Sequence, residues 1–356
     1  MRYQSKIKTI KHRGWLIAGA LLACFALSSP AESANRKDDM TLRASVMSAK
    51  AAKDLLTDVS VVGKKIVVVG NRGHILFSTD DGHTWTQGHV PVSVLLTGVF
   101  MVSEQEGWAI GHDAVILHTS DGGEHWELQY ANPYQQLSKA QLDKLTDEQY
   151  NELPRQGSPL LDLWFKNSKE GFVVGAYGVL LHTDNGGKTW DDWSSRLNNQ
   201  DNWHLNAIGS ADGKAIYIAG EKGNLFRSLD GGTTWSKLKS PYDGSFFGIM
   251  VGPDPASALV FGLQGHIYRT HDQGETWQQI NNPSDNGLMA GVNLNDHVII
   301  LVGNSGTILT SKDDGNTFSL QTTHDRQAIV GIGKTDNGKL VMVGQGGVKL
   351  AAPSAM

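Results

Sequence analysis

An octapeptide of the form Ser/Thr-x-Asp/Asn-x-Gly-x-x-Trp/Phe recurs six times in this chain of 356 residues. The aromatic residues that close successive copies lie 41, 64, 45, 42 and 41 residues apart. A period of this length predicts a series of similar supersecondary units that bury their apolar faces against one another. The one long interval predicts an insertion of about 22 residues between the second and third units. The copies are Ser78–Trp85, Thr119–Trp126, Thr183–Trp190, Ser228–Trp235, Thr270–Trp277 and Ser311–Phe318.

A second signature precedes each octapeptide and occurs a seventh time near the C-terminus. It consists of an apolar run, then Gly-x-x-Gly, then a second apolar pair. Two short apolar runs joined by a two-residue turn between glycines predict a β-hairpin. The second copy has Ala114 in place of the second glycine. The first glycines of the seven hairpins are Gly70, Gly111, Gly175, Gly220, Gly262, Gly303 and Gly344.

Mostly small residues form a third column, 12 to 14 positions before each hairpin glycine. Small side chains are expected where the innermost strands of a radial structure crowd around a narrow channel. Four strands in each repeat of about 42 residues, with seven repeats, predict an all-β fold: a seven-bladed β-propeller. The column consists of Asp58, Gly98, Asp162, Ala207, Gly248, Gly291 and Gly331.

The repeats place the propeller at residues 42–352, with a helical insertion at 131–159 between blades two and three. Within it, Ser138–Gln141 and Thr146–Gln149 fit capping boxes and predict helices over 139–145 and 147–153. The seventh repeat lacks the octapeptide. We therefore expect the alternating segment Leu42–Met47 to supply the outer strand that completes blade seven and closes the ring.

Residues 1–33 have the organisation of a signal peptide. Five basic residues precede the apolar run Trp15–Leu27, which is short for a membrane span, and Ala31–Ser33 fits a cleavage site. Residues 34–41 would be a linker. These features predict an exported, periplasmic protein with no membrane span in the mature chain. The only cysteine leaves an alternative, because Leu21–Cys24 could be a lipobox and Cys24 a lipid anchor. The formal charge of −5 argues against nucleic acid as a partner.

The octapeptide resembles the Asp-box, or bacterial neuraminidase repeat. Its carboxylate or amide is suited to accept backbone N–H bonds within a turn, and its glycine supplies a positive φ. Six copies around one rim cannot all be catalytic, so we assign them a structural role. These residues are Asp80, Asp121, Asn185, Asp230, Asp272 and Asp313.

Over residues 42–350 the chain resembles the photosystem II stability/assembly factor-like family of exported Asp-box propellers. The resemblance rests on the stretches Leu55–Trp85, Gly107–Trp126 and Pro159–Trp190. It implies a monomeric, non-enzymatic scaffold without a cofactor that assists assembly or stability of a membrane protein complex on its periplasmic or lumenal side. In phototrophs the family's partner site involves an arginine-rich patch. Here only Arg72, Arg155 and Arg326 fall in predicted top-face turns or loops, which departs from that pattern.

Propeller geometry gives the blades two ends. The octapeptide turns lie at one end, and the hairpin turns, the connections between blades and the insertion lie at the other, which we call the top face. Side chains vary there although the scaffold does not require variation, so we expect the partner to bind at this face. The candidate residues are Asn71, Arg72, Tyr177, Trp203, His204, Glu221, Lys222, Tyr242, His324 and Arg326.

Two other function classes remain open from the residues. An aromatic platform of Trp203, Tyr177 and Tyr242 would suit a carbohydrate- or peptide-binding module. Two carboxylates in the channel column, Asp58 and Asp162, would suit a sialidase-like glycoside hydrolase if they lay about 5–9.5 Å apart. The alternative role for these two aspartates is to accept hydrogen bonds within the channel. The sequence contains no HExxH metal motif and no nucleotide-binding Gly-x-Gly-x-x-Gly between a strand and a helix.

Overall fold

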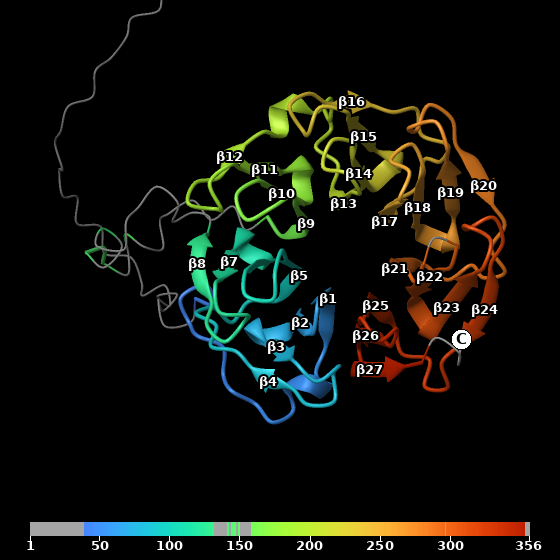
Figure 1. The fold of residues 1–356 in the computed structure, drawn as a ribbon. Coiled ribbons are helices and arrows are strands. Elements are labelled where there is room, and N and C mark those ends of the chain that lie inside the picture. Colours follow the sequence, from blue (N-terminus) through green and yellow to red (C-terminus); the bar gives the residue numbers. More distant parts are fainter. Residues whose placement is uncertain are drawn as a thin grey trace, which may run out of the picture. The chain divides into compact units, whose positions relative to one another are not determined.

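The computed structural model describes residues 39–131, 141, 144–146, 149, 158–295 and 297–352. Over these residues the chain forms seven small antiparallel sheets that follow one another around a common centre (Figure 1). The prediction of an all-β, seven-bladed propeller is confirmed. The predicted signal peptide and most of the insertion lie outside the described residues. Among the residues described, no helix is long and apolar enough to cross a membrane.

Each of the first six blades has four strands, which run in sequence order from the inside of the ring to the outside. Blades one to three are β1 (Leu56–Val62), β2 (Lys65–Gly70), β3 (Ile75–Ser78) and β4 (Thr86–Gln87); β5 (Leu96–Met101), β6 (Gly107–Gly111), β7 (Ile116–Thr119) and β8 (Glu127–Tyr130); β9 (Leu160–Phe165), β10 (Gly171–Gly175), β11 (Leu180–Thr183) and β12 (Asp191–Asp192).

The remaining blades are β13 (Leu205–Ser210), β14 (Ile216–Gly220), β15 (Leu225–Ser228) and β16 (Ser236–Lys237); β17 (Phe246–Val251), β18 (Ala258–Gly262), β19 (Ile267–Thr270) and β20 (Gln278–Ile280); β21 (Leu288–Asn293), β22 (Ile299–Gly303), β23 (Thr307–Ser311) and β24 (Ser319–Thr322); β25 (Ile329–Lys334), β26 (Leu340–Gly344) and β27 (Gly347–Ala351). Blade seven has three strands.

The hydrophobic core lies between neighbouring blades. The second strand of each blade is covered on both faces, so β6, β10, β14, β18 and β26 are buried along their whole length. Aromatic side chains fill the wider gaps. Trp108 of blade two, for example, stacks on Phe165 of blade three with 3.8 Å between ring centroids. Each blade is therefore held by its two neighbours, and the hairpin and octapeptide turns are carried on a rigid frame.

All seven inner strands contain a β-bulge at their second residue. The seven bulged residues together line a central channel of about 180 Å³. The ladder register corrects one member of the predicted small-residue column: Ala290, not Gly291, is the blade-six equivalent, because Ala290 pairs with Val302 as Gly331 pairs with Val343. The bulged residues are Thr57, Thr97, Leu161, Asn206, Phe247, Met289 and Val330.

The expected outer strand of blade seven is not formed, and this prediction was wrong. Residues 42–47 contain no strand and lie against the connection that follows β4 in blade one. Ser45 N–H donates to the Val90 carbonyl at 2.9 Å, and the Met40 carbonyl accepts from Ser93 N–H at 2.7 Å. These bonds satisfy the backbone of the segment at blade one. An alternating pattern predicts an extended segment but does not select the partner with which it pairs.

The ring closes through packing of blade one against blade seven. The glycines of β25 allow β1 to approach closely: a Cβ on Gly331 would lie 3.1 Å from the α-carbon of Asp58. Asn337 of blade seven donates to the Asp81 carboxylate of blade one at 2.7 Å. A short 3-10 helix, η2 (Ala51–Lys53), covers the first residue of β27. Closure therefore relies on the same sheet-to-sheet contacts that join the other blades.

Candidate partner-binding face

The hairpin turns at the top face have one backbone geometry and different side chains. In six blades the second turn residue is a non-glycine with φ between 54° and 58°. The left-handed region costs a non-glycine residue roughly 1 kcal/mol, and glycine or asparagine would occupy it more easily. The chain nevertheless places large or charged groups there. The six residues are Arg72, Asp113, Tyr177, Lys222, Gln264 and Ser305.

Five of the predicted residues come together at the tops of blades three and four. The turns η6 (Ala176–Gly178) and η8 (Glu221–Gly223) and the connection between these blades position them. His204 Nδ1 lies 2.7 Å from a Glu221 carboxylate oxygen, and the rings of Tyr177 and His204 are 5.1 Å apart. Lys222 Nζ lies 5.9 Å from the Trp203 ring. We call Tyr177, Trp203, His204, Glu221 and Lys222 the blade three–four patch.

The patch carries charges of both signs; Tyr177 and Lys222 are exposed, and Trp203, His204 and Glu221 are half-buried. Tyr177 is 63% exposed although it is a large aromatic residue. The hydrogen bond from His204 holds the pKa of Glu221 below its ordinary value, so this carboxylate is ionised at neutral pH. An exposed aromatic surface beside a cation and a carboxylate suits a polar or amphipathic segment of another protein.

A buried asparagine that sequence reasoning missed holds the patch in place. The Asn199 side chain donates to the Trp203 carbonyl at 2.8 Å and accepts from Trp203 N–H at 3.2 Å. Asn224, 2% exposed, donates to the same Asn199 amide oxygen. The sequence shows Asn199 only as one polar residue in a connecting loop. Its burial, which is what marks it as structural, cannot be inferred from the sequence.

The other predicted residues lie elsewhere. Asn71 and Arg72 belong to the blade-one turn, and His324 and Arg326 are exposed between blades six and seven. Tyr242 stacks on His266 of blade five at 4.4 Å and also contacts Phe246 and Tyr268. The Tyr242 carbonyl lies against Gly223 of η8, next to Lys222, while the Tyr242 ring packs on blade five, and among the described residues no ring contact joins it to Tyr177 or Trp203.

The two channel aspartates each join one blade to the next. Asp58 accepts from Val99 N–H at 2.8 Å, and Asp162 accepts from Ile208 N–H at 2.8 Å. Burial raises the pKa of Asp58 and of Asp162 to about 7, and the charge of Asp58 adds to the shift at Asp162. This geometry supports the hydrogen-bonding role that the sequence left open for them.

The polar bulged residues of the channel form hydrogen bonds between neighbouring blades. Thr57 and Thr97 each donate to a carbonyl of the following blade at 2.7 Å, and Asn206 does so at 2.8 Å. The remaining four bulged residues are apolar. The polar groups of the wall are thus used for joining blades.

The octapeptide turns share one hydrogen-bond network. In blade one Asp80 accepts from Ser78 Oγ, Thr84 N–H and Thr84 Oγ, at 2.6 to 2.9 Å. These donors hold the pKa of Asp80 well below its usual range. The Trp85 indole donates to the Gly82 carbonyl and pins the turn. The same contacts to the acceptor residue recur at Asp121, Asp230, Asp272 and Asp313, with His125 in place of threonine in blade two. Asn185 accepts from Thr183 Oγ and Thr189 N–H in the same way, but its amide nitrogen donates to Thr189 Oγ at 2.7 Å.

In the described part of the chain, one group of three side chains brings potential metal ligands together. Asp121, Glu124 and His125 have ligand atoms within 4.8 Å of one another on an exposed turn. His125 Nδ1 is bonded to Asp121 at 2.8 Å as part of the octapeptide network. The turn network accounts for this cluster without a metal.

Part of the insertion is described. Thr146 N–H donates to Gln149 Oε1 at 3.0 Å, and Gln149 N–H donates to Thr146 Oγ at 3.2 Å. This reciprocal pair is the capping box expected from the sequence. Most of the helices predicted over 139–145 and 147–153 lie outside the described residues.

Parts of this sequence match relatives of known identity. The chain is 38% identical over 87 residues to the photosystem II assembly lipoprotein Ycf48 of Synechococcus sp. strain CC9902, which is 24% of this chain and 26% of that one. It is 27% identical over 172 residues to the photosystem II assembly protein Ycf48 of Synechococcus sp. strain JA-2-3B'a(2-13), which is 48% of this chain and 45% of that one. The chain thus matches less than half the length of each of these relatives.

A solved structure described as YCF48 bound to D1 peptide superimposes with a TM-score of 0.64 and 18% identity, covering 84% of this chain and 93% of that one. At this identity the likeness shows the fold. The family described as "Photosynthesis system II assembly factor YCF48" matches residues 45–133 and 142–290, more than half of the sequence. The chain therefore belongs to the YCF48 family of photosynthesis system II assembly factors.

Proposed function

We propose that this protein is a non-catalytic scaffold that binds a segment of a membrane protein at its top face and supports assembly or stability of that protein's complex. The observation that carries the proposal is the blade three–four patch. It is aromatic and charged, Tyr177 and Lys222 are exposed on it, and these two residues occupy turns whose backbone would be more easily formed by glycine. Since six turns share this positive φ, the feature that singles out blades three and four is the exposed aromatic and charged pair Tyr177 and Lys222.

The relatives support this form of partner. The curated relatives are named for photosystem II assembly, and one solved relative is bound to a D1 peptide. We propose that the partner here likewise presents a peptide segment. Blades three and four offer an aromatic surface for its apolar side chains and a Glu221–Lys222 pair for its charges. The partner would lie on the exported side of the membrane, consistent with the signal peptide predicted at residues 1–33, and the scaffold would act as a monomer.

The channel aspartates do not favour a hydrolase. Each is already bonded to the backbone of the following blade. Among the described residues the Tyr242 ring makes no contact with the rings of Tyr177 and Trp203, which does not favour one continuous glycan platform. Shape and polar complementarity on a rigid ring need no chemistry, and the fold itself does not decide function.

A pair of matched variants tests the proposal. Tyr177→Gly removes the exposed aromatic from the patch, and Gln264→Gly makes the same change at the equivalent turn of blade five. Both positions have a left-handed φ, so glycine fits each without strain. The tagged chain is expressed in its host, and its partners are captured from solubilised membranes.

We expect one membrane protein to be captured by the unaltered chain and by Gln264→Gly, with a loss of about tenfold or more in Tyr177→Gly, as for an interface hot spot. Equal capture by all three proteins would contradict the assignment to blades three and four. Capture of no membrane protein by the unaltered chain would contradict the scaffold function.

A further inference from the structure

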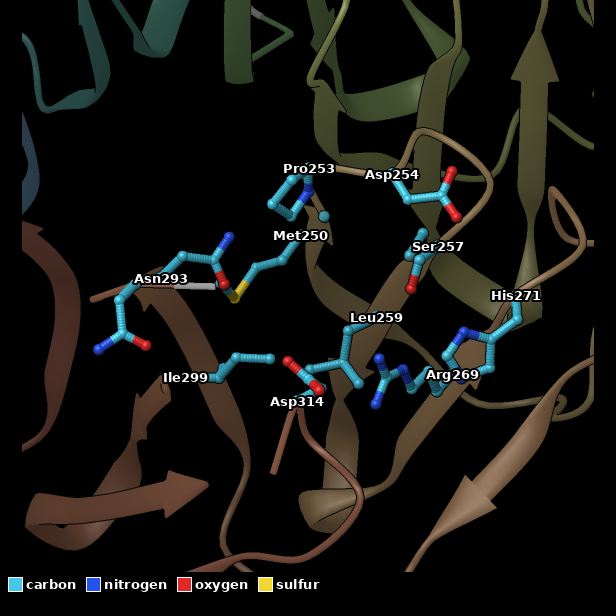
Figure 2. Close-up of a pocket in the computed structure, with 13 residues that line it drawn as sticks. Met250, Pro253, Asp254, Ser257, Leu259, Arg269, His271, Asn293, Ile299 and Asp314 are labelled. Atoms are coloured by element: carbon cyan, nitrogen blue, oxygen red, sulfur yellow. The ribbon is translucent and has the colours of Figure 1, made fainter. Parts of the chain in front are cut away.

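A cavity of about 340 Å³ lies between blades five and six at the octapeptide end of the strands (Figure 2). Met250, Leu259 and Ile299 give it an apolar surface. Arg269 and Asn293 are among the polar residues that line it. This is the opposite end of the blades from the hairpin turns, so the cavity is separate from the blade three–four patch.

Arg269 brings an unused donor to the cavity. Its Nη1 is buried and has no hydrogen-bond partner among the described residues. The nearest acidic group on the lining, Asp314, is bonded to His297 Nδ1 at 3.0 Å. A buried guanidinium nitrogen without an acceptor is unfavourable, so the position suits an acceptor from outside the chain.

The neighbouring blade shows how the repeat satisfies the same Nη1 atom, although Arg227 Nε there is also buried without a partner among the described residues. Arg227 is the equivalent of Arg269 one blade earlier, since both directly precede an octapeptide. Arg227 Nη1 donates to the Gln273 carbonyl at 2.6 Å and forms an ion pair with Glu275 at 3.0 Å. In the next octapeptide Asn316 stands where Glu275 would be. The close ion pair that Glu275 gives Arg227 is therefore not formed at Arg269 among the described residues, where the carboxylates of Asp314 and Asp313 act only at longer range.

The same comparison of blades four and five explains why the cavity exists. Tyr217 pairs with Arg227 in the strand ladder, and Leu259 pairs with Arg269. Tyr217 is 1% exposed and donates its hydroxyl to the Pro255 carbonyl, so it fills the gap between blades four and five. Leucine is smaller and leaves space between blades five and six. Two differences between adjacent repeats thus create both the cavity and the unpaired guanidinium.

We propose that this cavity binds a small organic monocarboxylate, with the carboxylate on Arg269 and the apolar body against Met250, Leu259 and Ile299. A planar guanidinium matches a carboxylate, and the apolar surface favours a hydrocarbon over an inorganic ion. Asp254 and Asp314 also line the cavity and disfavour ligands with two or three negative charges. The carboxylate could belong to a free acid or to the C-terminal residue of a peptide.

Ligand-observed NMR on the full-length chain tests the proposal with three probes. Sodium 3-methylbutanoate represents a free acid, an acetylated Gly-Gly-Val peptide represents a C-terminus, and 3-methylbutanamide is the neutral isostere of the acid. We expect at least one carboxylate to bind with a dissociation constant near 1 mM, about what seven or more heavy atoms support, and the amide to bind at least tenfold more weakly. Tighter binding of the peptide would identify a C-terminus as the ligand, and tighter binding of the acid would identify a free metabolite.

Two variants make the test independent of folding. Arg269→Gln should weaken carboxylate binding by about tenfold or more. The double variant Leu259→Tyr with Asn316→Glu recreates the blade-four arrangement and should abolish binding while Arg269 remains. Each variant is first shown by circular dichroism to unfold at a temperature close to that of the unaltered chain. Failure of both carboxylates to bind at 10 mM, about ten times the expected constant, would overturn the proposal, as would equal binding to the variants or equal binding of the amide.

Discussion

The two ends of the blades use one repeat in opposite ways. At the octapeptide end the residues whose side-chain oxygens build the turn, a serine or threonine and an aspartate or asparagine, are the same in kind in all six copies, while the positions between them vary. At the hairpin end the backbone is constant, whereas the exposed residue with positive φ differs from blade to blade. Side chains are therefore fixed where their atoms form the turn, and they are free to vary where only a backbone conformation is required.

Because of this difference, side chains of the top face can change without loss of the fold. A change of side chain at a hairpin turn leaves the ring contacts of the blade untouched. Tyr177 and Lys222 occupy equivalent turns of adjacent blades, and the connection that carries Trp203 and His204 lies between them. Side-chain changes at two turns and one connection can therefore come together at one place on the top face.

The largest effect on stability should come from a glycine of the octapeptide end. Gly232 has a φ of 89°, and a Cβ added there would meet the Phe172 ring of blade three. We expect Gly232→Ala to lower the free energy of unfolding by about 3 kcal/mol, measured by urea denaturation. Gly338 has a φ of 83° with no heavy atom within 4 Å of the added Cβ, so Gly338→Ala should cost only about 1 kcal/mol. Equal losses would show that packing against the neighbouring blade is not the cause.

The free energy of unfolding should depend on pH through an aspartate of the channel wall, which lies between the two ends. The pKa of Asp162 is about 7 in the fold and near 3.8 in the unfolded chain, so between these values the folded state binds the extra proton. Its contribution to stability is therefore present at pH 4 and is lost as the pH rises through 7.

Asparagine at this position can accept the same N–H bond but does not ionise. We expect Asp162→Asn to unfold with the same free energy as the unaltered chain at pH 4 and with about 2 kcal/mol more at pH 8, about half of the full shift because the channel admits water. Urea denaturation at the two pH values is the measurement. If the two proteins differed in free energy of unfolding by the same amount at both pH values, the assignment of the pKa shift to burial would be contradicted.

An aspartate of the octapeptide end should stabilise the fold at neutral pH and lose this contribution in acid, which is the opposite of Asp162. Asp230→Ala removes the acceptor for the Thr234 N–H and hydroxyl, and we expect a loss of about 1 kcal/mol at pH 7 by urea denaturation. The hydrogen bond from Thr317 lowers the pKa of Asp313 to about 2. The stability from such a turn is therefore present above pH 4 and is lost as the pH falls toward 2. A stabilised Asp230→Ala variant would show that the turn does not need its acceptor.

The smallest effect on stability belongs to the hairpin end. Tyr177→Gly relieves the left-handed strain of the turn but makes the unfolded chain more flexible, and the two effects are of similar size. We expect the free energy of unfolding to change by no more than about 0.5 kcal/mol in calorimetry. A loss of several kcal/mol would mean that Tyr177 supports the fold, and the contrast between the two ends would fail.

The repeat architecture could be predicted from sequence because each blade restates the same local information. The glycine-bounded turns and octapeptides fixed four strands and their order in every complete repeat. The segment Leu42–Met47 was misplaced because alternation of side chains says nothing about which edge offers partners for its backbone. The hydrogen bonds of Ser45 and Met40 to the blade-one connection decided its position.

The candidate surfaces show the same distinction between what repeat patterns predict and what depends on contacts in the folded chain. The variable turns indicate Tyr177 and Lys222 from the sequence alone, because these residues depart from a repeat. Asn199 was missed, since its role depends on contacts with a loop of no fixed pattern. The shared repeat position of Arg227 and Arg269 was visible in sequence. The cavity beside Arg269 was not, because it depends on which residue of the next blade faces it.

Site-specific photo-cross-linking in the host tests the central claim most directly. A benzophenone side chain is placed at position 177 in one protein and at position 264, the equivalent turn, in another. The account predicts a covalent adduct with a membrane protein from position 177 and little or none from position 264. Equal adducts from both positions, or an adduct from position 264 alone, would contradict the claim that the tops of blades three and four bind the partner.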